Sequence, residues 1–239
     1  MKVVILAGGK GTRLSEYTNS IPKPMVEIKG KPIIHHIINI YAHFGFSDFL
    51  IAVGYKGDVI KKYFDENYSL RKYSIKCINT GINTMTGGRV LKLKKYLTQN
   101  KFLMTYGDGV ANVNINKLLK FSESQKKILT VTAVRPPARF GYLKISKKNI
   151  VKNFTEKKQT DEGWINGGFF VCDKKIFNYI DGFNTFFERE PMENLSKENE
   201  LCAFKHQSFW QCMDNIRDKE YLDKIKKNNS NLPWLDFKN

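Results

Sequence analysis

The segment "LAGGKGTRL" at residues 6–14 places glycines, a threonine and an arginine directly after a run of apolar residues. In an open α/β sheet, ligands bind at the carboxyl ends of strands, so a glycine turn in this position suits phosphate. It is not a dinucleotide fingerprint, because Leu14 occupies the third glycine position, and no Gly-Lys-Ser/Thr closes a Walker A loop. What remains is a turn that offers backbone N–H groups to an anion, with Arg13 as a bidentate phosphate donor.

A second basic group follows in "IPKPM", where two prolines flank Lys23. Prolines stiffen the backbone on both sides, so the ammonium group is pre-positioned as a point charge for phosphate. The alternative is an ordinary surface lysine in a turn.

Two carboxylates from distant segments are candidate ligands for a metal. Asp108 lies in "TYGDG" at the end of an apolar stretch, and Asp214 lies in "FWQCMDNIRD". A single Asp in a turn is usually a local cap, and Asp214 could be the N-cap of the last helix. Two such carboxylates, completed by phosphate oxygens and water, suit octahedral Mg²⁺.

Taken together, "GG-x-G-T-R-L" and "P-K-P" resemble the signature of the sugar-nucleotide pyrophosphorylases, which join a nucleoside triphosphate to a sugar 1-phosphate. The likeness continues in order through "GYKGDVIKKYF", "TMTGGRV", "TYGDGV", "RFGYLKI", "GWINGGFFV" and "EREPME". These stretches are most similar to the branch that uses CTP. The resemblance implies transfer of a cytidylyl group from CTP to a sugar 1-phosphate, with α-D-glucose 1-phosphate as the expected acceptor, Mg²⁺ as cofactor, and CDP-glucose and pyrophosphate as products.

The resemblance also assigns roles to residues. Arg13, Lys23 and Asp108 are the expected catalytic groups, and Asp108 and Asp214 the expected metal ligands. Arg89 is expected to donate to the O2 and N3 atoms of cytosine. The full nucleotide set is Leu6, Ala7, Gly8, Gly9, Gly11, Thr12, Arg13, Lys23, Thr84, Gly88 and Arg89.

For the sugar phosphate, the resemblance implies Tyr106, Glu156, Lys157, Asn166 and Gly167. The chain departs from the family in two places. Lys158 replaces the proline of a Glu-Lys-Pro stretch. Near residues 65–75 the chain is also about twenty residues shorter than the family pattern. A homo-oligomer is expected, but its size is left open, because in relatives the longer stretch contributes subunit contacts.

The order of elements predicts a doubly wound, Rossmann-like α/β fold with a mixed sheet flanked by helices. "KVVILA", "DFLIAV", "YSIKCINT" and "KFLMTY" read as strands, with a further short strand in "PKPMVEI". They alternate with expected helices in "KPIIHHIINIYAHF", closed by Gly45, in "KGDVIKKYF" and over 115–124. From about residue 129 short β-rich runs dominate. We expect one domain over 1–239, with a nucleotide half at 1–128 and a sugar-phosphate half at 129–239.

Composition narrows the class of protein. The 239 residues are 41% hydrophobic, no run is long enough to span a membrane, and four scattered cysteines make no zinc pattern. We therefore expect a cytoplasmic protein without a membrane partner. The net charge of +17 suits phosphate-bearing ligands, although it also fits diffuse surface charge.

Three alternatives to the expected reaction stay open. A nucleic-acid binder has only net charge in its favour, and no matching motif, so no nucleic-acid partner is expected. A different phosphorylated acceptor would keep the chemistry. A non-catalytic nucleotide sensor would keep only the fold.

Overall fold

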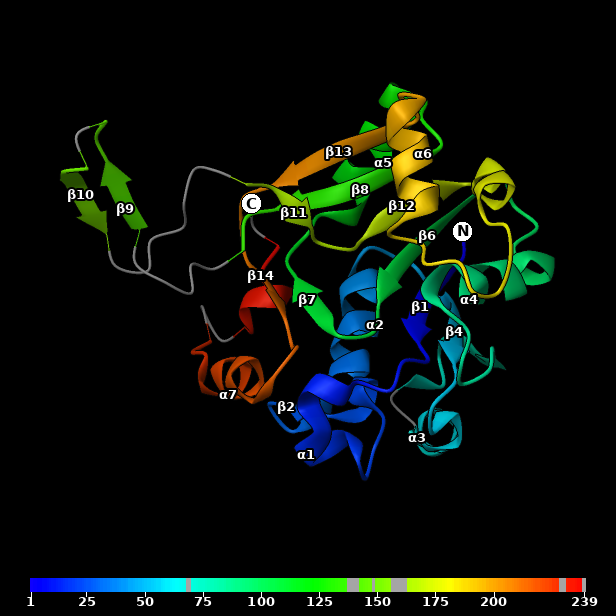
Figure 1. Cartoon of the computed structure of the whole chain (residues 1–239). Coiled ribbons are helices and arrows are strands. Elements are labelled where there is room, and N and C mark those ends of the chain that lie inside the picture. Colours follow the sequence, from blue (N-terminus) through cyan, green and yellow to red (C-terminus); the bar gives the residue numbers. More distant parts are fainter. Residues whose placement is uncertain (68–69, 137–141, 148, 156–162, 228–230, 238–239) are drawn as a thin grey trace.

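The computed structural model describes residues 1–67, 70–136, 142–147, 149–155, 163–227 and 231–237. The apolar run at the start of the chain forms strand β1 (Val3–Ala7), which is buried along its whole length. A strand covered on both faces needs apolar residues at every position rather than alternation. β1 therefore lies in the middle of the main sheet (Figure 1).

Parallel pairing surrounds β1. It lies between β4 (Asp48–Val53) and β6 (Lys101–Tyr106), and β5 (Ser74–Asn79) extends the sheet beyond β4. All four strands end at the same edge, because parallel strands run in one direction. The glycine turn after β1 and the "TYGDG" turn after β6 thus meet at that edge.

The second half of the chain completes the sheet with mixed pairing. β12 (Phe170–Asp173) lies antiparallel between β6 and β8 (Leu129–Val134). β11 (Ile165–Asn166) pairs with the far end of β8, and β13 (Leu201–His206) runs parallel to β8. The sequence predicts one β-rich run in "INGGFFVC", whereas the structure has two strands there. The run is interrupted because Gly168 (φ +75°) and the next residue take left-handed backbone angles. The expected mixed α/β architecture is confirmed.

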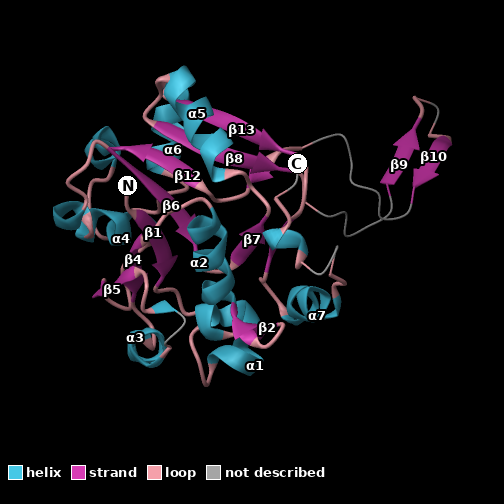
Figure 2. Cartoon of the chain, turned by 180° about the vertical axis from the view of Figure 1, so that it is seen from behind, coloured by secondary structure: helices cyan, strands magenta, loops and turns pink. Residues whose placement is uncertain are grey.

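Helices cover both faces of the sheet (Figures 1 and 2). Odd-numbered residues of β1 join one apolar core and even-numbered residues join the other, as strand alternation requires. The first core contains residues of α2 (Ile33–His43), α3 (Gly57–Glu66), α5 (Ile115–Gln125) and α7 (Ile216–Lys224), and the second contains residues of α4 (Thr86–Lys92) and α6 (Glu190–Lys197).

The segments that connect the main strands and helices contain short elements of their own. β7 (Gly109–Ala111) pairs with β14 (Trp210–Cys212), and β2 (Glu27–Ile28) pairs with β3 (Lys31–Pro32). β9 (Tyr142–Ile145) and β10 (Val151–Thr155) form a separate hairpin that lies apart from the main sheet in Figure 1. Helix α1 (Ser15–Thr18) follows the glycine turn, and 3₁₀ turns lie at Thr12–Leu14, Lys23–Met25, Lys94–Tyr96, Lys174–Tyr179 and Pro233–Leu235.

Most predicted elements are found near their expected bounds. The helix after residue 32 ends as predicted, with Gly45 at φ +86°. The strand expected in "PKPMVEI" is reduced to its last two residues, because Lys23–Met25 forms a 3₁₀ turn that begins directly after Pro22. Among the described residues, no helix is long and apolar enough to cross a membrane.

Candidate active site

A cleft of about 470 Å³ opens at the carboxyl ends of β1 and β6. Its floor is the glycine turn, and one wall comes from the segment that starts α4. Of the residues expected from the sequence, those lining the cleft are Leu6, Ala7, Gly8, Gly9, Gly11, Arg13, Lys23, Thr84, Arg89, Tyr106 and Asp108.

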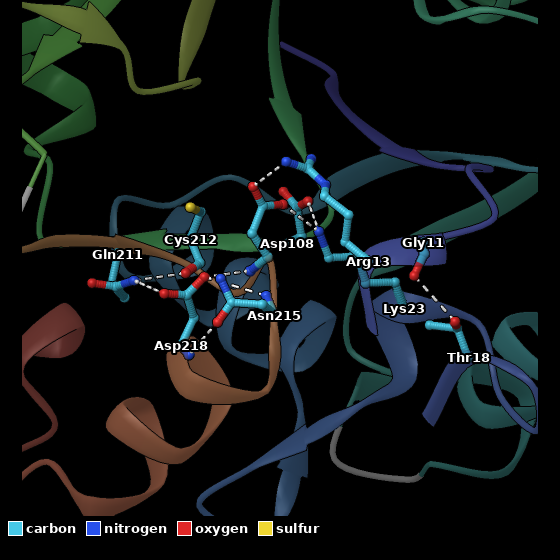
Figure 3. Close-up of polar contacts among 10 residues, drawn as sticks. Gly11, Arg13, Thr18, Lys23, Asp108, Gln211, Cys212, Asn215 and Asp218 are labelled. Carbon is cyan, nitrogen blue, oxygen red and sulfur yellow. Dashed lines mark hydrogen bonds and ion pairs between the residues drawn. The ribbon is translucent and has the colours of Figure 1, made fainter. Parts of the chain in front are cut away.

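Four charged side chains meet beside this cleft, and Figure 3 labels three of them, Arg13, Lys23 and Asp108. The Lys23 Nζ atom lies 2.7 Å from Asp108 Oδ2 and 2.8 Å from Asp214 Oδ1. The Arg13 Nη1 atom lies 2.9 Å from Asp214 Oδ2. The two carboxylates, which lie 85 and 191 positions from Lys23 in the chain, thus share one lysine.

The two basic groups differ in exposure. The Lys23 side chain is 11% exposed, whereas the Arg13 side chain is 75% exposed. Burial disfavours the charged lysine, but the ion pairs with Asp108 and Asp214 outweigh it and raise the pKa of Lys23. Lys23 is therefore a fixed cation inside the site, and Arg13 is an exposed cation at its rim.

Local structure explains how Lys23 and Asp108 reach this place. Lys23 lies in a 3₁₀ turn between Pro22 and Pro24. Asp108 follows β6 in a tight turn, and its carbonyl oxygen accepts a hydrogen bond of 2.8 Å from the backbone N–H of Met213. That bond fastens the β6 turn to the segment carrying Asp214.

Asp214 is not the N-cap of the last helix, contrary to that interpretation of the sequence. Asn215 caps α7, and its side chain forms a capping box with Asp218. The Asp218 carboxylate also accepts from the backbone N–H of Asp214 at 3.0 Å (Figure 3). The cap holds the backbone of Asp214 and leaves its carboxylate for Lys23 and Arg13.

The glycine turn is shaped by close contacts. Gly11 has φ +66°, and a side chain there would press against Lys23. A Cβ atom on Gly8 would lie 2.1 Å from Arg89 Nη1. Thr12 starts the 3₁₀ turn, and Thr18 Oγ1 donates to the Gly11 carbonyl at 3.1 Å (Figure 3).

Arg89 lines the cleft, but its guanidinium is hydrogen-bonded to the protein. Its two Nη atoms donate to Thr80 Oγ1 and to the carbonyl oxygens of Gly81, Gly8 and Ile82, at 2.6, 2.8, 2.9 and 3.3 Å. Burial lowers its pKa, and all four acceptors are uncharged. The guanidinium has five N–H groups, so the expected pair of bonds to cytosine O2 and N3 would require some of these contacts to be exchanged on binding. Arg89 ties the glycine turn to the segment 80–82.

Two other residues expected at the base have structural partners. Thr84 Oγ1 donates to the Thr80 carbonyl at 2.5 Å and accepts from Lys92 at 3.1 Å. Gly88 does not line the cleft; a Cβ there would lie 2.2 Å from the Phe183 carbonyl oxygen. Gly88 therefore allows α4 to pack closely against the segment 183–187.

At the sugar end, Tyr106 lines the cleft and Asn166 lies behind it. Asn166 Nδ2 donates to the Tyr106 hydroxyl oxygen at 3.1 Å. Gly167 packs against β8, and its carbonyl accepts from Trp210 Nε1 at 2.8 Å. Glu156 and Lys157 lie outside the described residues.

Sequence reasoning missed several residues of the cleft. Thr86 belongs to the quoted "TMTGGRV" stretch, and Phe186 lies two residues before "EREPME", so both are close to the motifs. The missed lining residues are Lys10, Pro24, Ile82, Asn83, Met85, Thr86, Gly107 and Phe186.

The comparison with protein families decides the classification. The model of the family described as Nucleotidyl transferase matches residues 2–236. The chain belongs to this family. It is 43% identical to glucose-1-phosphate cytidylyltransferase of Salmonella typhimurium, with 98% of each chain covered. It is 41% identical to the probable glucose-1-phosphate cytidylyltransferase of Bacillus subtilis, over 94% of this chain and 96% of the relative.

A solved structure supports the same fold. The crystal structure of HddC from Yersinia pseudotuberculosis matches with a TM-score of 0.73 and 27% identity, over 93% of this chain and 98% of the other. The family places the protein among nucleotidyltransferase enzymes, which generally use a divalent metal.

The residues present fit a metal of that kind. Asp108 and Asp214 supply carboxylate oxygens, the ligands that hard divalent cations prefer. Within the part of the chain that the structure describes, no group of three or more Asp, Glu, His or Cys side chains is arranged to hold a metal ion. The remaining ligands would then be phosphate oxygens and water, as is usual for Mg²⁺ at phosphate sites.

Proposed function

We propose that the protein transfers the cytidylyl group of CTP to α-D-glucose 1-phosphate, giving CDP-glucose and pyrophosphate. One observation carries the proposal. Lys23, Arg13 and two carboxylates meet beside a glycine turn, in a chain that matches a glucose-1-phosphate cytidylyltransferase from end to end.

The chemistry needs positioning and charge neutralisation rather than a covalent nucleophile. An oxygen of the sugar phosphate attacks the α-phosphorus of CTP, and the bond from that phosphorus to pyrophosphate breaks. N–H groups of the glycine turn hold the triphosphate. The exposed Arg13 binds the departing pyrophosphate, and Lys23 faces the α-phosphate. Loss of one preorganised donor of this kind typically lowers the rate by about 10²–10³.

Mg²⁺ is the metal we propose, held by Asp108 and Asp214. When bound, it supplies charge neutralisation of the phosphates. Lys23 and Arg13 together already neutralise these two carboxylates in the free protein, so the site is balanced before any phosphate arrives.

The test is pyrophosphate release with Mg²⁺ and each of CTP, UTP, dTTP, ATP and GTP, against a panel of hexose 1-phosphates. Turnover confined to CTP and glucose 1-phosphate is the expected result. CTP binding without turnover of any sugar in the panel would reject glucose 1-phosphate and favour a different phosphorylated acceptor. If CTP binds but also fails to turn over with phosphorylated acceptors beyond the panel, a non-catalytic sensor is favoured.

Two further expectations accompany the proposal. We propose a homo-oligomer, to be measured by light scattering on a sizing column, and a cytoplasmic location, to be measured by cell fractionation. Neither is needed for the assignment of the reaction.

A further inference from the structure

A carboxylate lies directly behind the wall of the cleft. Glu188 does not line the cleft itself, but its Oε1 atom accepts from the Tyr106 hydroxyl at 2.8 Å. Its Oε2 atom accepts from Thr86 Oγ1 at 2.6 Å. Both hydroxyl-bearing residues do line the cleft, so one carboxylate supports two positions on the wall.

Two backbone amides fix the direction of these hydrogen bonds. The N–H of Gly168 donates to Asn166 Oδ1 at 2.9 Å, so the Asn166 amide nitrogen must face Tyr106. The N–H of Phe187 donates to Thr86 Oγ1 at 2.9 Å, so the Thr86 proton is directed to Glu188. An amide nitrogen only donates and a carboxylate only accepts. The proton of Tyr106 therefore lies on the Glu188 side.

We infer that Glu188 is a positioning residue that makes the Tyr106 hydroxyl a hydrogen-bond acceptor for a hydroxyl group of the sugar. A tyrosine oxygen has two acceptor positions, and Asn166 occupies one of them. Among the described residues no hydrogen bond uses the other position, so it can accept from a ligand. An acceptor attracts a hydroxyl group and repels a phosphate oxygen, so Tyr106 selects the ring of the substrate and not its phosphate.

The surroundings of Tyr106 keep its proton in place. Burial, followed by the neighbouring Glu188, raises the pKa of Tyr106 well above its ordinary value. The ring is also fixed, because it packs edge-on against Phe170 with 5.6 Å between ring centroids. The direction of the hydrogen bond therefore does not change across the range of pH in which the enzyme is assayed.

The first experiment uses deoxy and deoxyfluoro analogues of glucose 1-phosphate, and it rests on the proposed function for its substrates. Fluorine cannot donate a hydrogen bond, so at one ring position both analogues should lose roughly tenfold in kcat/KM with the natural enzyme. The Tyr106→Phe variant should lose a similar factor with glucose 1-phosphate and lose nothing further with those analogues. An equal loss in both enzymes at every ring position would overturn the inference.

The second experiment concerns Glu188→Gln, which keeps the shape and removes one acceptor. The nitrogen of glutamine must meet either the Tyr106 or the Thr86 hydroxyl, and both already accept one hydrogen bond. We expect KM for glucose 1-phosphate to rise roughly tenfold while KM for CTP is unchanged. Glu190→Gln is the matched control, because Glu190 is exposed in the same segment. A parallel rise in both KM values would indicate a merely structural role.

A ligand-free measurement separates this inference from the proposed function. A tyrosine hydroxyl that donates to a carboxylate should give a downfield, slowly exchanging proton resonance in NMR, absent in Tyr106→Phe and shifted in Glu188→Gln. Without that resonance the direction assigned to Tyr106 is wrong, whatever the enzyme turns over. With it, failure to use any hexose 1-phosphate would overturn the proposed function and the sugar ligand, and leave Tyr106 an acceptor.

Discussion

At the scale of single residues, Lys23 shares its ammonium group between two carboxylates that also fit a metal. With Arg13, the four side chains sum to zero charge. Entry of a divalent cation alone would place two extra positive charges beside Lys23. We therefore expect the cation to bind together with the anionic nucleotide and only weakly to the free protein.

The Lys23→Met variant tests this charge balance. Without the ammonium, Asp108 and Asp214 leave the cluster with a net negative charge, so Mn²⁺ should bind the nucleotide-free variant more tightly. Turnover should fall by about 10²–10³, because a preorganised phosphate donor is lost. Mn²⁺ binding is measured by electron paramagnetic resonance. Lys62→Met, at a side chain 74% exposed on α3, is the control. Equal Mn²⁺ affinity in all three proteins would contradict the argument.

At the scale of elements, the glycine turn is held by the guanidinium of Arg89. A side chain on Gly8 would collide with that group, whereas a Cβ on the adjacent Gly9 would have nothing within 4 Å. Gly8→Ala should therefore destabilise the ligand-free protein by about 1–3 kcal/mol, because buried hydrogen bonds of Arg89 are lost. Gly9→Ala should leave the melting temperature nearly unchanged. Thermal unfolding of the two variants compares them directly, and equal melting temperatures would count against the Arg89 clamp.

The helix α2 carries a buried histidine with a predictable effect on acid stability. His35 is 3% exposed, and its Nδ1 atom lies 2.6 Å from the Tyr63 hydroxyl. Burial, and secondarily Lys31, lower the pKa of His35 from 6.5 to about 4. Between these values the unfolded chain binds a proton that the folded protein does not. The contribution of neutral His35 to the free energy of unfolding is thus complete above pH 6.5 and is lost as the pH falls toward 4.

His35→Gln removes this titration and keeps a hydrogen-bonding side chain for Tyr63. The shift corresponds to at most about 3 kcal/mol. Urea unfolding at neutral pH and near pH 4.5 should show a smaller loss of stability in the variant than in the natural protein. Identical losses of stability in the two proteins would mean that other titrating groups cause the loss of stability at acid pH.

The same elements show what the sequence could predict. Continuous apolar runs identify β1, β4 and β6, because a strand buried on both faces has mostly apolar side chains on both faces. Once the strands are known, the meeting of the glycine turn and the "TYGDG" turn at one sheet edge follows. The cap of α7 depends on a single position: the sequence analysis offered Asp214, and the structure has Asn215. The partners of Arg89 could not be predicted, because three of the four are backbone carbonyls brought together only by the folded chain.

At the scale of the whole molecule, both halves of the chain contribute to each apolar core. The core on the α2 side joins residues of β1 and α2 to Phe169, Met213 and Trp234, and the other joins β1 and α4 to Phe170 and Leu195. The nucleotide half and the sugar half therefore share their interior. We expect one cooperative unfolding transition, which is what the single-domain prediction requires.

Trp234 tests this expectation from the end of the chain. Its side chain is fully buried, and it packs edge-on against His36 of α2 with 5.3 Å between ring centroids. Trp234→Ala should cost about 3–5 kcal/mol, as for other buried aromatic residues. Since the residue belongs to the shared core, the whole calorimetric transition should move to lower temperature and remain single. A second transition, or a half of the molecule that melts unchanged, would show that the two halves fold independently.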